Sequence, residues 1–263
     1  MQTLVLGNGP MGLALADALR AAGEHVEVRG RPDAGGHPAD VFAGIDVVFD
    51  FSNPDAVAPN ITAGLAGGCR RFVIGTTGWD ADRDAVERRL LAAEASAVAA
   101  ANFSIGIGLF LRLVDGAVQL LGPLAEYDPY VLEWHRAGKV DRPSGTAKEI
   151  ARRVLAAHPR KRRVRSQDRS GPMDPDELEV ASVRAGASPG MHLVGFDAPG
   201  DSIELRVTAR DRSAYAAGAI AAARWLLAAP RHPGLHDLDA ILDDLSTTTD
   251  ADGVTASPQG VMA

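Results

Sequence analysis

Short apolar runs alternate with helical patterns along the first part of the chain. The runs Thr3–Leu6, Val47–Phe51 and Phe72–Gly75 are almost entirely apolar, which is typical of strands buried on both faces. The other predicted elements here are a helix over Met11–Ala22, a strand at His25–Arg29, a helix over Asp82–Ala95 and a strand near Ala97–Ala101. Such alternation predicts parallel strands joined by crossover helices.

The pattern changes after Phe103. A helix over Gly108–Leu121, a strand at Tyr130–Trp134 and a capped helix over Ser144–Ala157 come first. Three alternating segments follow, and they predict strands of a mixed or antiparallel sheet: Glu179–Arg184, Gly190–Phe196 and Ser202–Ala209. An Ala-rich helix is predicted over Ser213–Ala229. The chain from Ser246 on lacks a periodic apolar face, which predicts a disordered tail.

Composition narrows the class of protein. The chain has 263 residues, 46% of them apolar, and a formal net charge of -7, which disfavours nucleic acid as a partner. The basic run Arg160–Arg165 is interpreted as a solvated strand edge or loop. A single cysteine, Cys69, indicates a reducing compartment. Since the sequence shows neither a signal peptide nor a run long enough to span a bilayer, we expect a soluble, cytoplasmic protein.

A glycine-rich motif follows the first strand and opens the first helix. Its residues are Gly7, Asn8, Gly9, Pro10, Met11 and Gly12, in the pattern G-x-G-x-x-G. The first glycine permits a tight turn, the second lets a pyrophosphate approach the backbone, and the third lets helix and strand pack closely. Free amides at the helix N-terminus then bind the anion. The motif predicts dinucleotide binding; the alternative is a glycine-rich turn without a ligand.

The end of the second strand bears on the choice of cofactor. An NAD site usually carries an acidic residue there, whereas this chain has Arg29 and Arg31. Arginine cannot accept a hydrogen bond from a ribose hydroxyl, but it pairs well with a 2′-phosphate. The sequence therefore favours NADPH, with NADH as the alternative cofactor. Two exposed surface arginines without a ligand are the other interpretation.

Later segments resemble one known family. The most specific runs from Glu133 to Ala147 and reads EWHRAGKVDRPSGTA. It resembles the E-x-H-H-x-x-K-x-D-x-P-S-G-T-A signature of dihydrodipicolinate reductases, also called 4-hydroxy-tetrahydrodipicolinate reductases. Weaker matches are Asp50–Ala56, Gly75–Trp79, Ala101–Gly106, Arg184–Gly186, Gly190–His192 and Val194–Phe196. The resemblance covers about Thr3 to Leu245.

The resemblance implies an α/β fold of two domains. Residues 1–104, completed by 225–246, would form a Rossmann dinucleotide-binding domain. Residues 105–224 would form an α+β substrate-binding and oligomerisation domain whose open mixed sheet usually builds a homotetramer. Residues 247–263 remain as the predicted tail.

The resemblance also implies the site residues. The loop from Gly7 to Gly12 would hold the pyrophosphate, and the nicotinamide end would be lined by Gly75, Thr76, Thr77, Ala100, Ala101, Asn102 and Phe103. His135 would be the general acid and Lys139 the second catalytic group. Ser144, Gly145 and Thr146 would grip a substrate carboxylate.

Physical chemistry supports this assignment, although each part has a simpler interpretation. Ser144 is a good N-cap, so free amides and hydroxyls converge at the start of the helix that follows it. Lys139 adds charge, and His135 can supply a proton near neutral pH. A His–Lys pair in a loop is often a pair of surface residues without a catalytic role. Ser-Gly-Thr before a helix is often a helix cap without a ligand. Their occurrence behind a dinucleotide domain favours a catalytic site.

The sequence departs from the family at three places. Arg136 stands where the family has its second histidine, Pro10 stands where an arginine is common, and the acid after the second strand is absent. Arg136 is still suited to binding a carboxylate, so we place it among the substrate-binding residues. It could equally mark a relative that acts on a different imine acid.

The sequence and the resemblance together indicate an oxidoreductase of the diaminopimelate route to lysine. It would use NAD(P)H to reduce 4-hydroxy-tetrahydrodipicolinate, a small cyclic imine-type dicarboxylate, to tetrahydrodipicolinate with loss of water. The alternatives are a related imine reductase with another substrate and a non-catalytic NADPH-binding sensor. Histidines are scattered without paired ligand spacing, so no metal site is predicted from the sequence.

Overall fold

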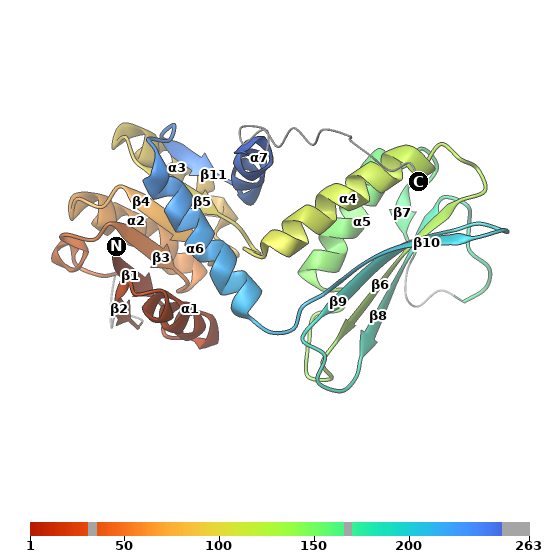
Figure 1. Cartoon of the computed structure of the whole chain (residues 1–263), viewed down its shortest axis with the longest axis horizontal. Coiled ribbons are helices and arrows are strands. Elements are labelled where there is room, and N and C mark those ends of the chain that lie inside the picture. The colour runs from red at the N-terminus through yellow and green to blue at the C-terminus, as the bar shows by residue number, and fades with distance from the viewer. Residues whose placement is uncertain (31–35, 166–169, 249–263) are drawn as a thin grey trace, which may run out of the picture. The chain divides into compact units, whose positions relative to one another are not determined.

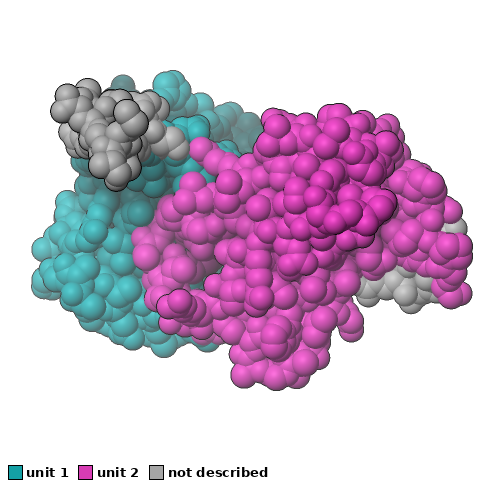
Figure 2. Space-filling view, turned by 45° about the vertical axis from the view of Figure 1, so that its right-hand side comes forward, with its two compact units in different colours: residues 1–101, 219–263 teal, residues 102–218 magenta. Residues whose placement is uncertain are grey.

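The computed structural model describes residues 1–30, 36–165 and 170–248, and the described chain divides into two compact units. Unit 1 combines residues 1–101 with the described part of 219–263, and unit 2 comprises residues 102–218 (Figure 2). The boundary at Ala101 lies three residues before the end of the predicted first domain at position 104. Arg31 lies outside the described residues. Most of the predicted tail (residues 247–263) also lies outside the described residues. Its first two residues belong to a helix that ends at Thr248.

Unit 1 is a Rossmann-like α/β unit (Figure 1). Its six-stranded sheet has the order β11-β5-β4-β3-β1-β2, with every neighbouring pair parallel. Its elements are β1 (Gln2–Leu6), α1 (Pro10–Ala21), β2 (His25–Arg29), η1 (Ala39–Phe42), β3 (Val47–Asp50), α2 (Pro54–Ala66), β4 (Arg71–Ile74), η2 (Asp80–Asp82), α3 (Arg83–Ala92), β5 (Ser96–Ala99), β11 (Gly234–His236) and α7 (Leu238–Thr248).

The apolar runs of the sequence form the central strands of this sheet. Leu4 and Leu6 on β1 pack with Phe72 on β4 in one core cluster, which α2 and α3 complete. Val5 on β1 points to the other face and is also fully buried. Burial on both faces explains why these strands lack polar alternation. The strand order reverses around β1, which has β2 on one side and β3 on the other, and such a switch point is where open α/β sheets bind ligands.

Unit 2 is built on a five-stranded mixed sheet of order β10-β9-β6-β8-β7. β6 pairs parallel with β8 and antiparallel with β9, which confirms the predicted mixed sheet. Its elements are α4 (Ile105–Leu121), β6 (Asp128–His135), α5 (Gly145–Ala157), β7 (Arg163–Val164), β8 (Glu177–Arg184), β9 (Met191–Asp197), β10 (Ser202–Thr208) and α6 (Ser213–Ala228). The boundary between the units falls within α6, after Gly218.

Helices α4 and α5 lie side by side on one face of this sheet (Figure 1). Successive strand residues point to opposite faces, so Val131, Glu133 and His135 of β6 share the face that the helices cover. Val131 joins the apolar core formed with α4 and α5. Glu133 and His135 continue the same row and are also buried. The end of β6 therefore places a carboxylate and an imidazole at the border of the apolar core.

The basic run is only partly the solvated segment that the sequence predicts. β7 is an edge strand, and Arg163 on it is half exposed and pairs with Asp174 at 2.9 Å and with Asp176. Lys161, however, is fully buried and pairs with Asp128 at 2.5 Å, so the prediction is wrong for this residue. An ammonium group is seldom buried without a partner, and Asp128 is that partner here.

Among the described residues, no helix combines the length and the apolar character that a membrane span requires.

Candidate functional site

The glycine loop joins β1 to α1 at the switch point of the unit 1 sheet. Gly7 has a φ of +110°, and a Cβ there would lie 2.2 Å from the carbonyl oxygen of Phe51. A Cβ on Gly12 would lie 2.0 Å from the carbonyl oxygen of Gly7. A Cβ on Gly9, in contrast, would meet nothing within 4 Å. Gly7 and Gly12 are thus required by the fold, whereas Gly9 keeps space free outside it.

The first turn of α1 has the form of an anion site. Gly9 is its N-cap and provides no side-chain cap, so the helix N-terminus is left to a ligand or to water. Pro10 occupies the first helical turn, where its missing amide costs the helix no hydrogen bond. The departure from the family at Pro10 is therefore compatible with the helix. The loop fits the pyrophosphate of a dinucleotide, because Gly9 leaves the approach open.

Arg29 ends β2 beside this loop. Its carbonyl oxygen accepts a hydrogen bond from the amide of Gly7 at 2.8 Å, and its half-exposed guanidinium pairs with the carboxylate of Glu27. A ligand phosphate would therefore compete with Glu27 for this side chain.

The loops after β3 and β4 are joined by a buried aspartate. Asp50 has no exposed surface; its Oδ1 accepts hydrogen bonds from Ser52 Oγ at 2.6 Å and Thr76 Oγ1 at 2.9 Å, and its Oδ2 accepts one from Asn60 Nδ2 at 2.9 Å. These bonds fix Thr76 relative to β3 and α2. Asp50 is not among the site residues that the sequence predicts, although a lone acidic residue at the end of a buried strand is a signal for it.

The remaining residues expected at the nicotinamide end are distributed over both units. Gly75 packs closely, since a Cβ there would lie 2.3 Å from the ring of Phe51, and Thr77 is exposed. Ala100 donates its amide to Ile74 at 3.1 Å and lies in unit 1 with Ala101. Two others belong to unit 2: Asn102, whose Oδ1 accepts from the amide of Ser104 at 2.9 Å, and Phe103, which is buried edge-on against Tyr215.

In unit 2, the signature segment connects the end of β6 to the start of α5. Ser144 is the N-cap of α5, and its Oγ accepts from the amide of Ala147 at 3.2 Å. Within the described chain, the amides of Gly145 and Thr146 have no hydrogen-bond acceptor. Because the positive end of the helix dipole adds to these free donors, the first turn of α5 suits a carboxylate.

Three cations lie in the loop before that helix: Arg136, Lys139 and Arg142, the last of which donates to the carbonyl oxygen of Ser182. Lys139 Nζ pairs with Asp141 at 2.7 Å. The hydrogen bond from Lys139 is the largest of the effects that hold the pKa of Asp141 below its ordinary value. Arg136 is exposed, and its side chain makes no hydrogen bond or ion pair with the described chain. Arg136 is therefore available to an anionic ligand, while Lys139 already has a carboxylate beside it.

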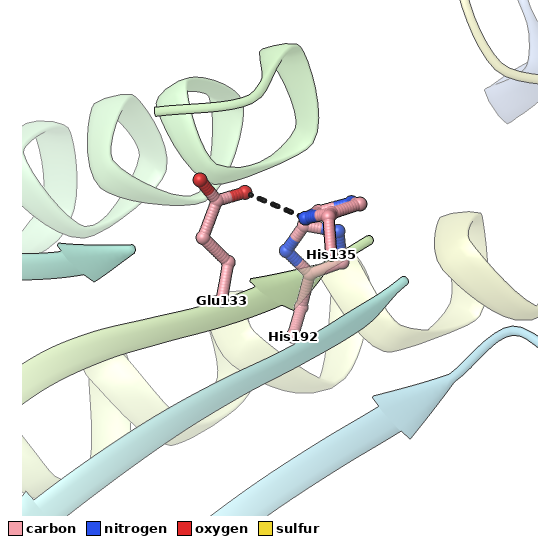
Figure 3. Close-up of side chains that lie close together, drawn as sticks. All are labelled: Glu133, His135 and His192. Carbon is pink, nitrogen blue, oxygen red and sulfur yellow. Dashed lines mark ion pairs between the residues drawn. The ribbon is translucent and has the colours of Figure 1, made fainter. Parts of the chain in front are cut away.

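His135 lies in a buried cluster that the sequence alone did not show (Figure 3). Its Nδ1 is 3.3 Å from Glu133 Oε2, two residues earlier on β6. The ring of His192, on β9, lies edge-on to the ring of His135, with centroids 5.1 Å apart and an interplanar angle of 67°. Glu133 and His192 are direct neighbours in the antiparallel register. The cluster thus arises from strand pairing.

The charges in this cluster are set by burial and hydrogen bonding. Burial acts to raise the pKa of Glu133, but hydrogen bonds from Ser144, Ser182 and Arg184 outweigh it and hold that pKa at about 2. Burial lowers the pKa of His135, and the charge of Glu133 partly opposes this. Burial also lowers the pKa of His192 to about 4. At neutral pH, an ionised carboxylate therefore faces two largely uncharged imidazoles.

A carboxylate oxygen of Glu133 and ring nitrogens of His135 and His192 lie within 4.8 Å of one another. Carboxylate and imidazole side chains are common metal ligands. The guanidinium of Arg184, however, lies 2.8 Å from Glu133 Oε1 and already neutralises this carboxylate. Lys139 and Arg184 both act on His135 as positive charges. A positive surrounding of this kind favours an anionic substrate over a metal cation.

Comparisons with known proteins agree with these two units. Residues 1–103 match the family model described as Dihydrodipicolinate reductase, N-terminus, and residues 106–242 match Dihydrodipicolinate reductase, C-terminus. A 4-hydroxy-tetrahydrodipicolinate reductase from Chromobacterium violaceum is 36% identical over 203 residues, which is 76% of this chain and 74% of the relative.

Solved structures show the same fold. A dipicolinate-bound dihydrodipicolinate reductase from Paenisporosarcina sp. TG-14 superimposes with a TM-score of 0.69 at 22% identity, covering 90% of this chain and 97% of the other. A probable dehydrogenase from Thermotoga maritima superimposes with a TM-score of 0.52 at 10% identity, covering 86% and 88%.

Proposed function

The chain belongs to the dihydrodipicolinate reductase family, an NAD(P)H-dependent group of oxidoreductases of the lysine pathway, and we propose that it reduces 4-hydroxy-tetrahydrodipicolinate to tetrahydrodipicolinate. In this reaction the substrate gains a hydride and a proton and loses water, while NAD(P)H becomes NAD(P)⁺. The observation that carries the proposal is the single stretch of unit 2 that brings together His135, Lys139 and the free amides at the start of α5.

The residues of unit 2 have distinct roles in the proposed reaction. The amides of Gly145 and Thr146, with Ser144 as their N-cap, bind one substrate carboxylate. Arg136 is free to bind the other carboxylate in a bidentate manner. His135 supplies the proton, and Lys139 adds positive charge beside it. The nicotinamide supplies the hydride when it is bound, and the protein orients the reactants and excludes water.

Steady-state turnover tests the proposal. Enzymatically generated 4-hydroxy-tetrahydrodipicolinate is offered with NADPH and with NADH in parallel, and cofactor oxidation is followed by absorbance. Turnover with either cofactor supports the reductase. A chain that binds the cofactor but turns over none of the substrate would instead be a sensor. Turnover of another cyclic imine acid in a substrate panel, in preference to this one, would identify the related imine reductase, for which the departure at Arg136 is the specific argument.

We propose NADPH as the preferred cofactor, with NADH as the alternative. The support is Arg29 beside the glycine loop and Arg31, which follows it in the sequence. Replacing each arginine by alanine, singly and together, should weaken NADPH binding much more than NADH binding, because only NADPH carries the 2′-phosphate. Calorimetric titration of both cofactors measures this. Arg20→Ala, an exposed arginine on α1, is the matched control. Equal losses for the two cofactors would contradict the assignment.

Arg136 is proposed as a carboxylate clamp. Arg136→Ala should raise KM with little change in kcat, because a clamp binds the ground state and the transition state alike. Arg136→His restores the family's residue and should recover a part of the lost affinity if the substrate is the family's own. Initial rates over a range of substrate concentrations separate the two constants. A drop confined to kcat in Arg136→Ala would show that this residue acts on the chemical step.

We also propose a homotetramer assembled through the unit 2 sheet. The face opposite α4 and α5 carries Trp134 and Val183, adjacent on β6 and β8 and 39% and 41% exposed. Apolar side chains exposed side by side are typical of an interface. Light scattering after size exclusion should give four times the chain mass, and Trp134→Lys should lower it. A monomeric wild-type protein would contradict this.

A further inference from the structure

The two oxygens of the Glu133 carboxylate have different surroundings. Oε1 accepts hydrogen bonds from the amide of Ser144 at 3.0 Å, from Ser182 Oγ at 2.6 Å and from Arg184 Nη2 at 2.8 Å. Oε2 has no bond of this kind and faces His135 Nδ1 at 3.3 Å (Figure 3). The donors come from the start of α5 and from β8. The carboxylate is therefore fixed on one side by three groups and offers its other oxygen to the imidazole.

The other nitrogen of His135 faces a glycine. A Cβ on Gly190 would lie 3.1 Å from His135 Nε2, and the φ of Gly190 is +151°. Any larger residue would crowd that nitrogen. The ring of His135 is thus bounded by Glu133 at Nδ1 and by a residue without a side chain near Nε2.

His192 restricts the angle of the same ring. His192 is 5% exposed, and its ring contacts that of His135 edge-on. With its pKa lowered to about 4, chiefly by burial, it carries no charge near neutral pH. An uncharged ring can pack against a protonated His135 without electrostatic repulsion. The buried ring of His192 therefore limits rotation of the His135 ring.

We infer that Glu133 and His192 are positioning residues that hold His135 with a proton on Nδ1, so that Nε2 is the nitrogen that takes up and delivers the catalytic proton. Nδ1 and Oε2 lie 3.3 Å apart without completing a hydrogen bond in this ring orientation. A proton on Nδ1 is favoured there, because an ionised carboxylate can only accept. The hydrogen bond at one ring nitrogen decides which nitrogen is free for chemistry. This inference deepens the proposed function and rests on it for the role of His135 as the acid.

The charge of Glu133 should affect the pH dependence of the reaction. The charged and titratable groups around His135 are Glu133 on β6, Arg184 on β8, His192 on β9, and Lys139 and Asp141 in the loop. Glu133 raises the pKa of His135, while burial, Lys139 and Arg184 lower it. Glu133→Gln should therefore lower the pKa of His135 further. Because a general acid must be protonated, the fall in kcat/KM with rising pH should begin at lower pH in this variant.

Nitrogen-15 NMR of histidine-labelled protein tests the inference directly, without substrate. Spectra of His135→Gln and His192→Phe assign the two rings. Above the pKa of His135, the wild type should show a protonated Nδ1 and a bare Nε2, and Glu133→Gln should shift the population toward a protonated Nε2. A wild-type His135 that is protonated on Nε2 would overturn the inference, even if Glu133→Gln fails to fold.

Kinetics of two His192 variants provide the second readout. His192→Ala removes the ring that packs against His135. It should lower kcat about 10- to 100-fold, as a misplaced catalytic group does. His192→Phe keeps a ring and should recover most of that loss. Equal kcat values for both variants and the wild type would contradict the role of His192. A chain with the expected tautomer but no turnover would refute the proposed function alone, whereas turnover with the opposite tautomer would refute this inference alone.

Discussion

His135→Gln and Lys139→Ala should each lower kcat about 10²- to 10⁴-fold while the protein stays folded, since general acid assistance typically contributes this much. His135 is buried, and Glu133 faces its Nδ1. Glutamine keeps a polar side chain of similar length there but cannot donate a proton at neutral pH. Lys139 supplies positive charge beside the imidazole, so its loss should affect the chemical step. Single-turnover rates with saturating cofactor measure the chemical step.

The controls for these variants are residues of the same type elsewhere in the chain. His25→Gln changes an exposed histidine on β2, and Lys148→Ala changes an exposed lysine on α5. Both should keep kcat close to the wild-type value, and circular dichroism should show that all four variants fold. Near-wild-type kcat in both His135→Gln and Lys139→Ala would remove these residues from the mechanism and would favour a non-catalytic role.

Gly9→Val should abolish measurable cofactor binding while leaving the thermal unfolding midpoint nearly unchanged. The reason is local, because a Cβ at Gly9 meets no protein atom within 4 Å but occupies the space through which a pyrophosphate approaches. Gly12→Ala should instead destabilise the fold, since its Cβ would lie 2.0 Å from the carbonyl oxygen of Gly7. Calorimetric titration with NADPH and thermal unfolding separate the two effects.

The matched control is Gly200→Val. Gly200 lies in unit 2, and a Cβ there also meets nothing within 4 Å. This variant should bind the cofactor as the wild type does. Wild-type cofactor affinity in Gly9→Val would mean that the glycine loop is a turn without a ligand, which is the alternative that the sequence leaves open.

The sequence by itself determined the class of fold and the positions of most elements. Buried parallel strands leave nearly continuous apolar runs, and amphipathic helices leave an apolar face, so both are visible without a structure. The Gly7–Gly12 loop was equally visible, because close packing at Gly7 and Gly12 admits only glycine. The segment from Glu133 to Ala147 was specific enough to indicate the family, which the comparisons then showed.

Only the tertiary structure decided what surrounds the proposed acid. His192 and Arg184 are distant from His135 in the sequence, and strand pairing of β6 with β9 and β8 brings them beside it. Side-chain partners were equally hidden, as for Lys139 with Asp141 and for the buried Lys161 with Asp128. Local periodicity reports which face of an element is buried, but not which residues of other elements meet there. The charge state of His135 depends on those neighbours, so it follows from the fold and not from the sequence pattern.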